Sequence, residues 1–257
     1  SNACMEQMRT KGSKGMDPCP LLEEYGGIWQ FKDDQPGQDQ IADGYHYATG
    51  LRHCVAVEWN RKTDHLYVVQ HGRDQLHQFF PDLYTEKESA ELPAEEMFLV
   101  DDGFDGGWPY CYYDQLQNKK VLAPEYGGDG MITGRCDQKA DPIAAFPGHY
   151  APNELIFYHE EMFPEKYKDG AFIAFHGSWN RGPFEQEGYN IVFLPFADEY
   201  PSDEYEVFAD NFDGVEEVKS PRDAEYRPCG LAVAPDGSLF VSDSNTGKIW
   251  KIVWEGE

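Results

Sequence analysis

The residues of this chain that are best suited to bind an anion are arginines and histidines in short turns. Three of these turns directly follow strand-like runs, at residues 49–53, 70–74 and 175–181, and a fourth at residues 226–230 precedes one. The chain has eight arginines, and four of them lie in these turns: Arg52, Arg73, Arg181 and Arg227. A guanidinium pairs with a carboxylate or phosphate in a bidentate manner. In a chain of net charge -26, this clustering indicates an anion site on loops at one end of a β scaffold.

The strand-like segments that must carry these turns recur along the chain. Residues 54–69 predict an alternating strand, a polar turn and a second strand, and residues 230–242 repeat the pattern with a tighter Pro-Asp-Gly turn. The glycine of that turn supplies the positive φ of a hairpin. A third strand is expected at residues 248–254, and residues 171–175 and 189–194 form a degenerate middle copy. Repeats of short strands bounded by Gly and Pro favour an all-β fold, a β-propeller. The alternative is a β-sandwich, which also uses alternating hairpins.

Length and composition narrow the class of protein. A chain of 257 residues can bury a sizeable core as one domain. No run of 18 apolar residues occurs, so no membrane span is expected. The strong negative charge argues against nucleic acid or anionic membranes as partners. Helical periodicity is weak, with one or two turns expected within residues 160–168. Residues 1–3 (Ser-Asn-Ala) fit either a cleavage scar or native sequence.

The six cysteines predict two disulfides. Cys4 and Cys19 bracket a Lys/Gly/Ser-rich segment, and Cys111 and Cys136 bracket a glycine-rich loop. A disulfide in each place would contribute roughly 3 kcal/mol in the chain-entropy model. The remaining two, Cys54 and Cys229, are expected to be reduced. Because disulfides persist in oxidising compartments, we expect a periplasmic or secreted protein.

Six short motifs, in order along the chain, resemble those of one known family. They are Gly-Leu-Arg-His at 50–53, His-Gly-Arg-Asp at 71–74, Gly-Trp-Pro at 107–109, His-Tyr-Ala-Pro at 149–152, Phe-His-Gly-Ser-Trp-Asn-Arg at 175–181, and Arg-Pro-Cys-Gly-Leu at 227–231 followed by Pro-Asp-Gly at 235–237. The family is that of the glucose/sorbosone dehydrogenases, which are soluble sugar dehydrogenases dependent on pyrroloquinoline quinone (PQQ). Its members are six-bladed propellers with the quinone at the mouth of the central channel. The L-sorbosone dehydrogenase-like branch is nearest, through residues 111–114, 125–128 and 176–180.

The resemblance implies roles for nine residues. The cofactor-binding residues would be Arg52, His53, His149, Asn180, Arg181 and Arg227. The metal-binding residues would be Gly72 and Arg73, whose backbone carbonyls would bind the Ca²⁺ that also holds PQQ, and Glu96 at a second, structural Ca²⁺. One departure is Glu225, which stands where the family has a second arginine near the quinone carboxylates.

The resemblance also implies that part of the ring is not contained in this chain. The family's general base is a histidine in a His-x-Gly-Gly strand upstream of the segment resembling residues 27–31, and this sequence has no His-x-Gly-Gly. We therefore expect a disulfide-stapled loop at residues 1–26 and a partial propeller at residues 27–257, with about three blades plus one strand at residues 28–31. The chain alone would be inactive, and a second copy or the missing N-terminal blades would pack on its exposed flanks.

The function implied is a PQQ- and calcium-dependent sugar dehydrogenase, acting on an aldose or a sorbosone-like sugar by hydride transfer to the quinone. The sequence specifies neither the sugar nor the electron acceptor. One alternative is a non-catalytic carbohydrate- or protein-binding propeller, and a second is a calcium-dependent lactonase, whose acidic cage the chain does not provide. Each site residue also has a structural interpretation. The arginines would bond blade carbonyls, Glu95 and Glu96 would be a solvated pair, and Trp108 and Trp179 would be packing residues.

Overall fold

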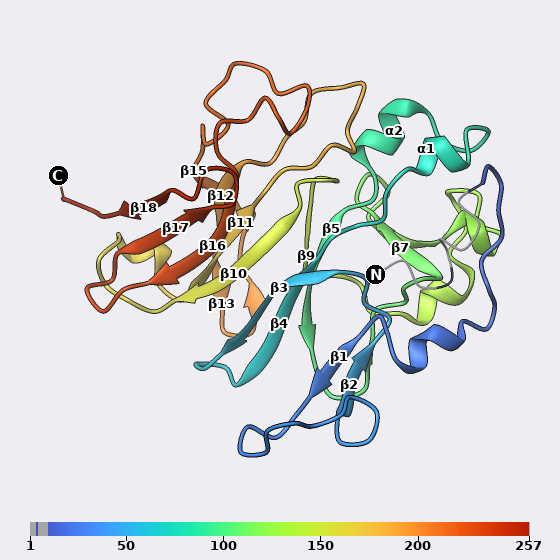
Figure 1. Ribbon diagram of the computed structural model, residues 1–257, viewed down its shortest axis with the longest axis horizontal. Helices are drawn as coiled ribbons and strands as arrows, with labels where there is room; N and C mark the ends of the chain where they lie inside the picture. Colours follow the sequence, from blue (N-terminus) through green and yellow to red (C-terminus); the bar gives the residue numbers. More distant parts are fainter. Residues whose placement is uncertain (1–3, 5–9, 257) are drawn as a thin grey trace.

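Three sheets follow one another in sequence and in space in the computed structural model, which describes residues 4 and 10–256 (Figure 1). The first comprises β3 (Cys54–Asn60), β4 (His65–Gln70), β5 (Glu95–Val100) and β9 (Ala144–Phe146). The second comprises β10 (Pro152–Tyr158), β11 (Gly170–Phe175), β12 (Asn190–Leu194) and β15 (Glu206–Ala209). The third comprises β16 (Pro228–Val233), β17 (Leu239–Asp243) and β18 (Ile249–Ile252). Neighbouring strands are antiparallel throughout, so the three sheets are successive blades and confirm the propeller prediction.

The two predicted hairpins form where their turn residues require them. The β3–β4 hairpin closes at the pair Asn60 and His65, with Asp64 at φ 62°. The β16–β17 hairpin closes at the pair Val233 and Leu239, and Gly237 takes φ 83°. Glycine adopts that left-handed conformation without the steric cost of a Cβ atom. The predicted turn chemistry is therefore confirmed.

The core lies between the blades. One buried cluster joins the first blade to the second and includes Tyr67, Met97 and Phe175. Another joins the second blade to the third, and Phe172 and Val241 lie in it. The inner strand β10 contacts β3 on one side and β16 on the other. This shared packing brings the starts of the three inner strands, β3, β10 and β16, close together. The candidate site lies at this end of the blades.

Smaller elements complete the fold. The short strands are β1 (Ile28–Gln30), β2 (Tyr45–Thr49), β6 (Phe104–Asp105), β7 (Cys111–Asp114), β8 (Lys119–Leu122), β13 (Phe196–Ala197) and β14 (Tyr200–Pro201). The strand predicted at residues 28–31 forms as β1, in a small sheet with β2 and β6. Strand β2 was not predicted. The helices are α1 (Leu76–Phe79), α2 (Glu86–Glu91) and the 3₁₀ turns η1 (Pro20–Glu23), η2 (Pro124–Tyr126), η3 (Gly134–Gln138) and η4 (Glu165–Tyr167).

The helical prediction is confirmed at its lower limit. Within residues 160–168 one turn forms, the 3₁₀ turn η4. The α2 helix was not predicted, although Thr85 and Glu88 form a reciprocal capping box at its start, which satisfies backbone donors that a helix leaves unpaired. None of the helices within the described residues is long and apolar enough to cross a membrane.

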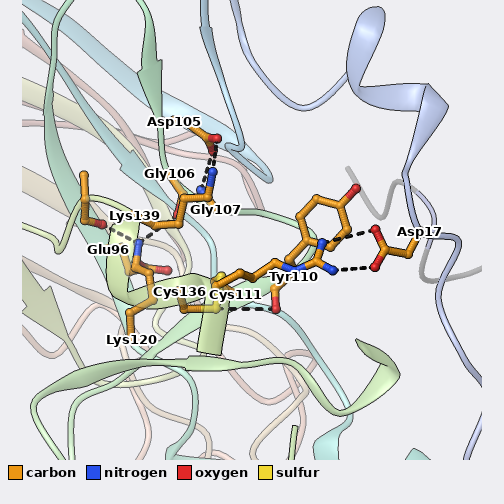
Figure 2. The surroundings of a disulfide bond; sticks show 12 residues. Asp17, Glu96, Asp105, Gly106, Gly107, Tyr110, Cys111, Lys120, Cys136 and Lys139 are labelled. Atoms are coloured by element: carbon orange, nitrogen blue, oxygen red, sulfur yellow. Dashed lines mark hydrogen bonds and ion pairs between the residues drawn. A yellow bond between two sulfur atoms is a disulfide. The ribbon is translucent and has the colours of Figure 1, made fainter. Parts of the chain in front are cut away.

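Both predicted disulfides are confirmed. The S–S distance is 2.02 Å between Cys4 and Cys19 and 2.03 Å between Cys111 and Cys136, and Figure 2 shows the surroundings of the second bond. In the part of the chain that the structure describes, Cys54 and Cys229 are unpaired, as predicted. Burial raises the pKa of the Cys54 thiol to about 12, so this thiol stays protonated. Residues 1–3 lie outside the described part, and the domain boundary after residue 26 stays a prediction.

Candidate functional site

All four arginine-bearing turns lie at the same end of the blades. That end is where the inner strands begin, as the strand pairs Cys54–Gln70, Pro152–Phe175 and Pro228–Asp243 establish within each sheet. Hydrogen bonds join these ends within and between blades. The backbone N–H of His71 donates to the His53 carbonyl at 3.0 Å within the first blade, and the His71 ring bonds the carbonyl of Pro152, in the second blade, at 2.9 Å. The predicted common end is therefore confirmed.

A cavity of about 150 Å³ opens at this end, between the first and second blades. Its walls come from turns that are far apart in sequence and carry imidazoles, carboxylates and one guanidinium. The lining residues are Arg52, His53, His71, Gly72, Asp74, Glu95, His149, Ala151, Ser178 and Asn180. Five predicted site residues are among them: Arg52, His53, Gly72, His149 and Asn180. The structure thus brings together most of the predicted cofactor residues.

Arg52 extends across the cavity wall with a nearly buried side chain. Its guanidinium donates to the Gly72 carbonyl at 2.5 Å and to the Asp74 carboxylate at 2.8 Å. It also lies over the Trp108 ring, 5.6 Å from the ring centroid. The predicted packing role of Trp108 is confirmed, because its side chain is buried. Arg52 is therefore held in place from three sides.

Asp74 connects three loops through its carboxylate. Besides Arg52, it accepts a hydrogen bond from the Asn180 amide at 2.7 Å and faces His149 Nδ1 at 3.6 Å. Burial disfavours the charged form, but the interactions with His149 and Arg52 outweigh it and lower the pKa of Asp74 to about 2. The carboxylate is therefore ionised at neutral pH and provides a negative charge in the cavity.

Glu95 is a buried carboxyl that fixes two backbone segments. It accepts hydrogen bonds from the N–H of Gly72 at 2.6 Å and from the N–H of Ala151 at 3.0 Å. Burial raises the pKa of Glu95 to about 7 in spite of these bonds. The expectation of a solvated pair was wrong for both Glu95 and Glu96, which are buried.

His53 and His71 form a pair of rings on another wall, with centroids 4.8 Å apart. The His71 Nε2 atom donates to a carbonyl, which leaves its Nδ1 as an acceptor. Burial, with the nearby His53 and Arg52, lowers the pKa of His71 to about 4. Burial and the charge of Arg52 also lower the pKa of His53. Both rings are thus neutral at neutral pH.

Four predicted site residues do not line this cavity. Arg73 is buried beneath it, and its guanidinium pairs with Glu125 at 2.5 and 2.8 Å. Arg181 is also buried and donates to three backbone carbonyls, those of Ala90, Gly148 and Glu185.

The other two predicted site residues outside the cavity, Arg227 and Glu96, also have polar partners. Arg227 donates to the carbonyls of His176 and Gly177 at 3.1 and 2.5 Å, which ties the second blade to the third. Glu96 forms an ion pair with Lys120 at 3.2 Å. For Arg227 the expected structural role of bonding blade carbonyls is thus observed, on the same end of the blades as the cavity.

Asp74, Glu95 and Ser178 line the cavity but were not predicted as site residues, and His71 was expected only as a polar residue in a turn. Asp74 belongs to the His-Gly-Arg-Asp motif. Its position directly after Arg73, in a turn predicted to bind an anion, could have indicated that it lies in the site. Trp179 was expected to pack, but its side chain is 61% exposed, so that prediction was wrong. In the described residues, no group of three or more His, Cys, Asp or Glu side chains is placed to hold a metal.

Comparison with known proteins identifies the family. The model of the TrAA12-like family matches residues 28–255. The chain belongs to the TrAA12-like family. Its sequence is 24% identical to the pyrroloquinoline quinone-dependent pyranose dehydrogenase of Coprinopsis cinerea, over 94% of this chain and 36% of that protein. It is 25% identical to an uncharacterised protein of Borreliella burgdorferi, over 81% of this chain and 48% of that protein.

Solved structures resemble the fold of this TrAA12-like chain. A calcium structure of the Trichoderma reesei carbohydrate-active enzyme of family AA12 has a TM-score of 0.69 at 21% identity, covering 93% of this chain and 63% of that chain. The holo form of the PQQ domain of the Coprinopsis cinerea pyranose dehydrogenase has a TM-score of 0.68 at 19% identity, covering 95% and 66%. The TrAA12-like chain therefore spans less than half the length of the curated relatives it matches and about two thirds of these structures. The suspected relationship to PQQ-dependent sugar dehydrogenases is confirmed, and the L-sorbosone branch stays a prediction.

Proposed function

We propose that this protein is a PQQ- and calcium-dependent dehydrogenase that oxidises an aldose or a sorbosone-like sugar. The observation that supports this most directly is the cavity at the inner-strand ends, where Arg52, Asp74 and Asn180 form one hydrogen-bonded group. Its loops carry the motifs that resemble those of the sugar dehydrogenases. Such clefts between rigid elements, with a few convergent polar groups, are the usual ligand sites of proteins.

The residues present fit PQQ in charge and in hydrogen-bonding capacity. PQQ carries three carboxylates, and Arg52 and Arg227 offer guanidinium groups at this end of the blades. The Asn180 Oδ1 atom is buried and has no hydrogen-bond partner within the described residues, and such an acceptor favours a ligand donor or a cation beside it. A cavity of about 150 Å³ would hold only part of the tricyclic ring, because ligand pockets usually measure about 300–1,000 Å³.

The chain would position the cofactor, and the quinone would accept two electrons as a hydride when bound. In this proposal Arg52 and Arg227 bind carboxylates, while Asp74 orients Arg52 and the Asn180 amide. Calcium takes oxygen ligands, and the proposed ones are the carbonyls of Gly72 and Arg73, where the Gly72 carbonyl would exchange its hydrogen bond from Arg52 for the ion. Glu95 would fix that carbonyl pair, because its carboxyl accepts the Gly72 N–H. His53, His149 and Arg181 complete the proposed cofactor-binding group.

Replacing Arg52 or Arg227 by Ala should weaken PQQ binding by the full-length gene product. Losing a charge-assisted hydrogen bond costs about 1.5–3 kcal/mol, or roughly ten- to a hundred-fold in affinity. Titration of the apo protein with PQQ in excess Ca²⁺, followed by quinone absorbance, measures the change. Arg61→Ala is the matched control, since Arg61 lies exposed in the turn at the opposite end of β3. Unchanged affinity in both site variants would count against the site, and a wild-type protein that binds no PQQ would favour the non-catalytic binding propeller.

The flanks of the described blades favour a further partner. Val55, Val57 and Trp59 lie on one face of β3 and are exposed, because alternate residues of a strand share a face. At the other flank, β18 pairs only with β17 among the described strands, and Ile249 on it is exposed. Exposed apolar faces and unpaired sheet edges mark interfaces. We propose that further blades cover these flanks in the full-length protein.

A polypeptide limited to residues 1–257 should therefore self-associate. Light scattering combined with intact mass measures its state, and we expect dimers or larger species whose fraction rises with concentration. Val57→Lys should reduce association, since it places a charge at the centre of the apolar face of β3. A stable monomer at all concentrations would show that these residues close a compact fold by themselves.

The two disulfides favour an oxidising compartment, and we propose a periplasmic or secreted location. The sugar and the electron acceptor are left open. The lactonase alternative, which requires a central cage of acidic and Asn metal ligands, stays a prediction.

A further inference from the structure

Lys120 carries a buried ammonium group inside a cage of oxygen atoms. Its side chain is 2% exposed. The Nζ atom donates to the carbonyls of Gly106 and Ala140 at 2.8 and 2.6 Å and lies 3.2 Å from Glu96 Oε2 (Figure 2). The ring of Phe98 closes the cage, with its centroid 4.8 Å away. Three oxygens from three separate segments thus surround one cation.

This arrangement does not fit a calcium ion at Glu96. The Glu96 side chain is 3% exposed, and the Lys120 ammonium already neutralises it. Its other oxygen accepts a hydrogen bond from the Gln70 amide at 3.0 Å. A divalent cation at these oxygens would have to expel the ammonium into a buried, apolar surrounding, which is costly for a charge. The lysine therefore takes the place in which a structural metal was expected.

Two routes of contact lead from this cage to Arg52 in the cavity wall. The first passes through Glu96 and Gln70: the Gln70 amide nitrogen donates to Glu96, and its amide oxygen accepts the backbone N–H of Arg52 at 2.8 Å. Both Glu96 and Gln70 are buried. Since the amide of Gln70 is fixed at both ends, the position of Glu96 determines the position of the Arg52 backbone.

The second route passes through the segment that follows β6. Lys120 holds the Gly106 carbonyl, and the Gly106 N–H donates to the Thr49 carbonyl at 3.1 Å. The Trp108 N–H then donates to the Gly50 carbonyl at 2.9 Å. Any side chain at Gly106 would collide with the Gly50 carbonyl, which lies 2.7 Å from the position of a Cβ atom. The same segment places the Trp108 ring under the Arg52 guanidinium.

We propose that Lys120 is a positioning residue for Arg52 and acts as the permanent cation of the Glu96 cage. Its charge fixes Glu96 on one side and Gly106 on the other, and the two contact routes converge on the backbone and the guanidinium of Arg52. The Glu96 cage then binds no calcium, and all calcium taken up with PQQ goes elsewhere. The part of this inference that concerns PQQ rests on the proposed function.

The test compares Lys120→Met with the matched control Lys119→Met in the full-length protein. Lys119 is the neighbouring lysine, and its exposed ammonium donates to the Met131 carbonyl at 2.7 Å. A third variant, Glu96→Gln/Lys120→Met, removes both buried charges, so that no carboxylate is left unpaired. Hydrogen exchange of the peptide covering residues 50–56 measures the order of the Arg52 turn without any ligand. Calcium titration and PQQ titration with excess Ca²⁺ measure binding.

We expect faster exchange of the Arg52 turn in Lys120→Met and in the double variant, and wild-type exchange in Lys119→Met. PQQ affinity should fall about 10-fold or more in both Lys120 variants, as is typical when a group that orients a ligand-binding residue is lost. The thermal midpoint should fall by roughly 10 °C in Lys120→Met and recover in the double variant. Glu96→Gln alone should leave the calcium stoichiometry unchanged.

Each of the three measurements, hydrogen exchange, calcium titration and PQQ titration, has a result that would contradict the inference or the proposed function. Loss of one bound calcium in Glu96→Gln would show that the cage is a metal site. Wild-type exchange of residues 50–56 in the double variant would show that Lys120 does not position Arg52. A wild-type protein that binds no PQQ would instead refute the proposed function. The hydrogen-exchange and calcium measurements would still determine the role of Lys120.

Discussion

Replacing Arg73 by Met should lower the free energy of unfolding by about 3–5 kcal/mol. Arg73 and Glu125 have side chains only 4% and 5% exposed, and they form a bidentate pair. Tyr84 and Tyr112 lie close by and are themselves buried. Removing the guanidinium would leave the Glu125 carboxylate buried without a counter-charge, which costs far more than the loss of a surface pair. Urea unfolding followed by circular dichroism measures the change.

A second arginine–carboxylate pair of similar geometry provides the control. Arg135 and Asp17 form two hydrogen bonds, but their side chains are 44% and 43% exposed. Because an exposed pair is worth about 0–1 kcal/mol, Arg135→Met should leave the unfolding midpoint almost unchanged. The double variant Arg73→Met/Glu125→Leu should recover most of the stability that Arg73→Met loses. Equal effects of the two single arginine variants would contradict the importance of burial.

The hairpins could be predicted from the sequence because each is specified locally. The β3–β4 and β16–β17 segments combine strict alternation with a polar turn, and both signals lie within a few residues. Strand β10 was missed, since its Pro152 and its mixed burial hide the alternation. Strand β5 was missed for a different reason. Its two acidic residues indicate a solvated segment, whereas both are buried.

The burial of Glu95 and Glu96 depends on partners that are distant along the chain. Glu96 is neutralised by Lys120, and Glu95 accepts the N–H groups of Gly72 and Ala151. No local pattern around residues 95–96 could reveal these contacts. They arise only when the first blade packs against the loop of β7 and β8 and against the start of β10.

The candidate site likewise depends on contacts between distant segments. The position of the turns at strand ends predicted correctly that four arginines gather at one end of the blades. The sequence could not indicate which of their side chains enter the cavity. Arg52 lines it, whereas the Arg73 side chain turns into the core toward Glu125. That choice depends on the location of the buried carboxylates, which only the tertiary structure determines.

Acidification from pH 7.5 to pH 4 should destabilise the protein by roughly 3 kcal/mol through groups at this end of the blades. Burial lowers the pKa values of His71 and His176 from an ordinary 6.5 to about 4. Between those values the unfolded chain binds a proton on each ring and the folded chain does not. The stability from each histidine is therefore complete above pH 6.5 and is lost as the pH falls to 4.

Glu95 opposes this loss, and its removal should make the acid sensitivity greater. Burial raises the pKa of Glu95 from 4.5 to about 7, so the folded protein binds a proton that the unfolded chain has released. Stability due to this group falls as the pH rises from 4.5 to 7, and acidification restores it. In Glu95→Gln the loss between pH 7.5 and pH 4 should grow to roughly 7 kcal/mol, because the two histidines then act without opposition. The change with pH is the quantity to compare, since any constant effect of the substitution cancels.

Urea unfolding at half-unit steps of pH measures this difference for the wild type, Glu95→Gln and a control. The control is Glu86→Gln, since Glu86 lies exposed in the first turn of α2 and should leave the wild-type profile unaltered. His71→Gln should make the profile shallower, because it removes one of the two protons taken up on unfolding. A Glu95→Gln profile parallel to that of the wild type would show that Glu95 is ionised in the folded protein at pH 5–6, and that its two backbone hydrogen bonds outweigh its burial.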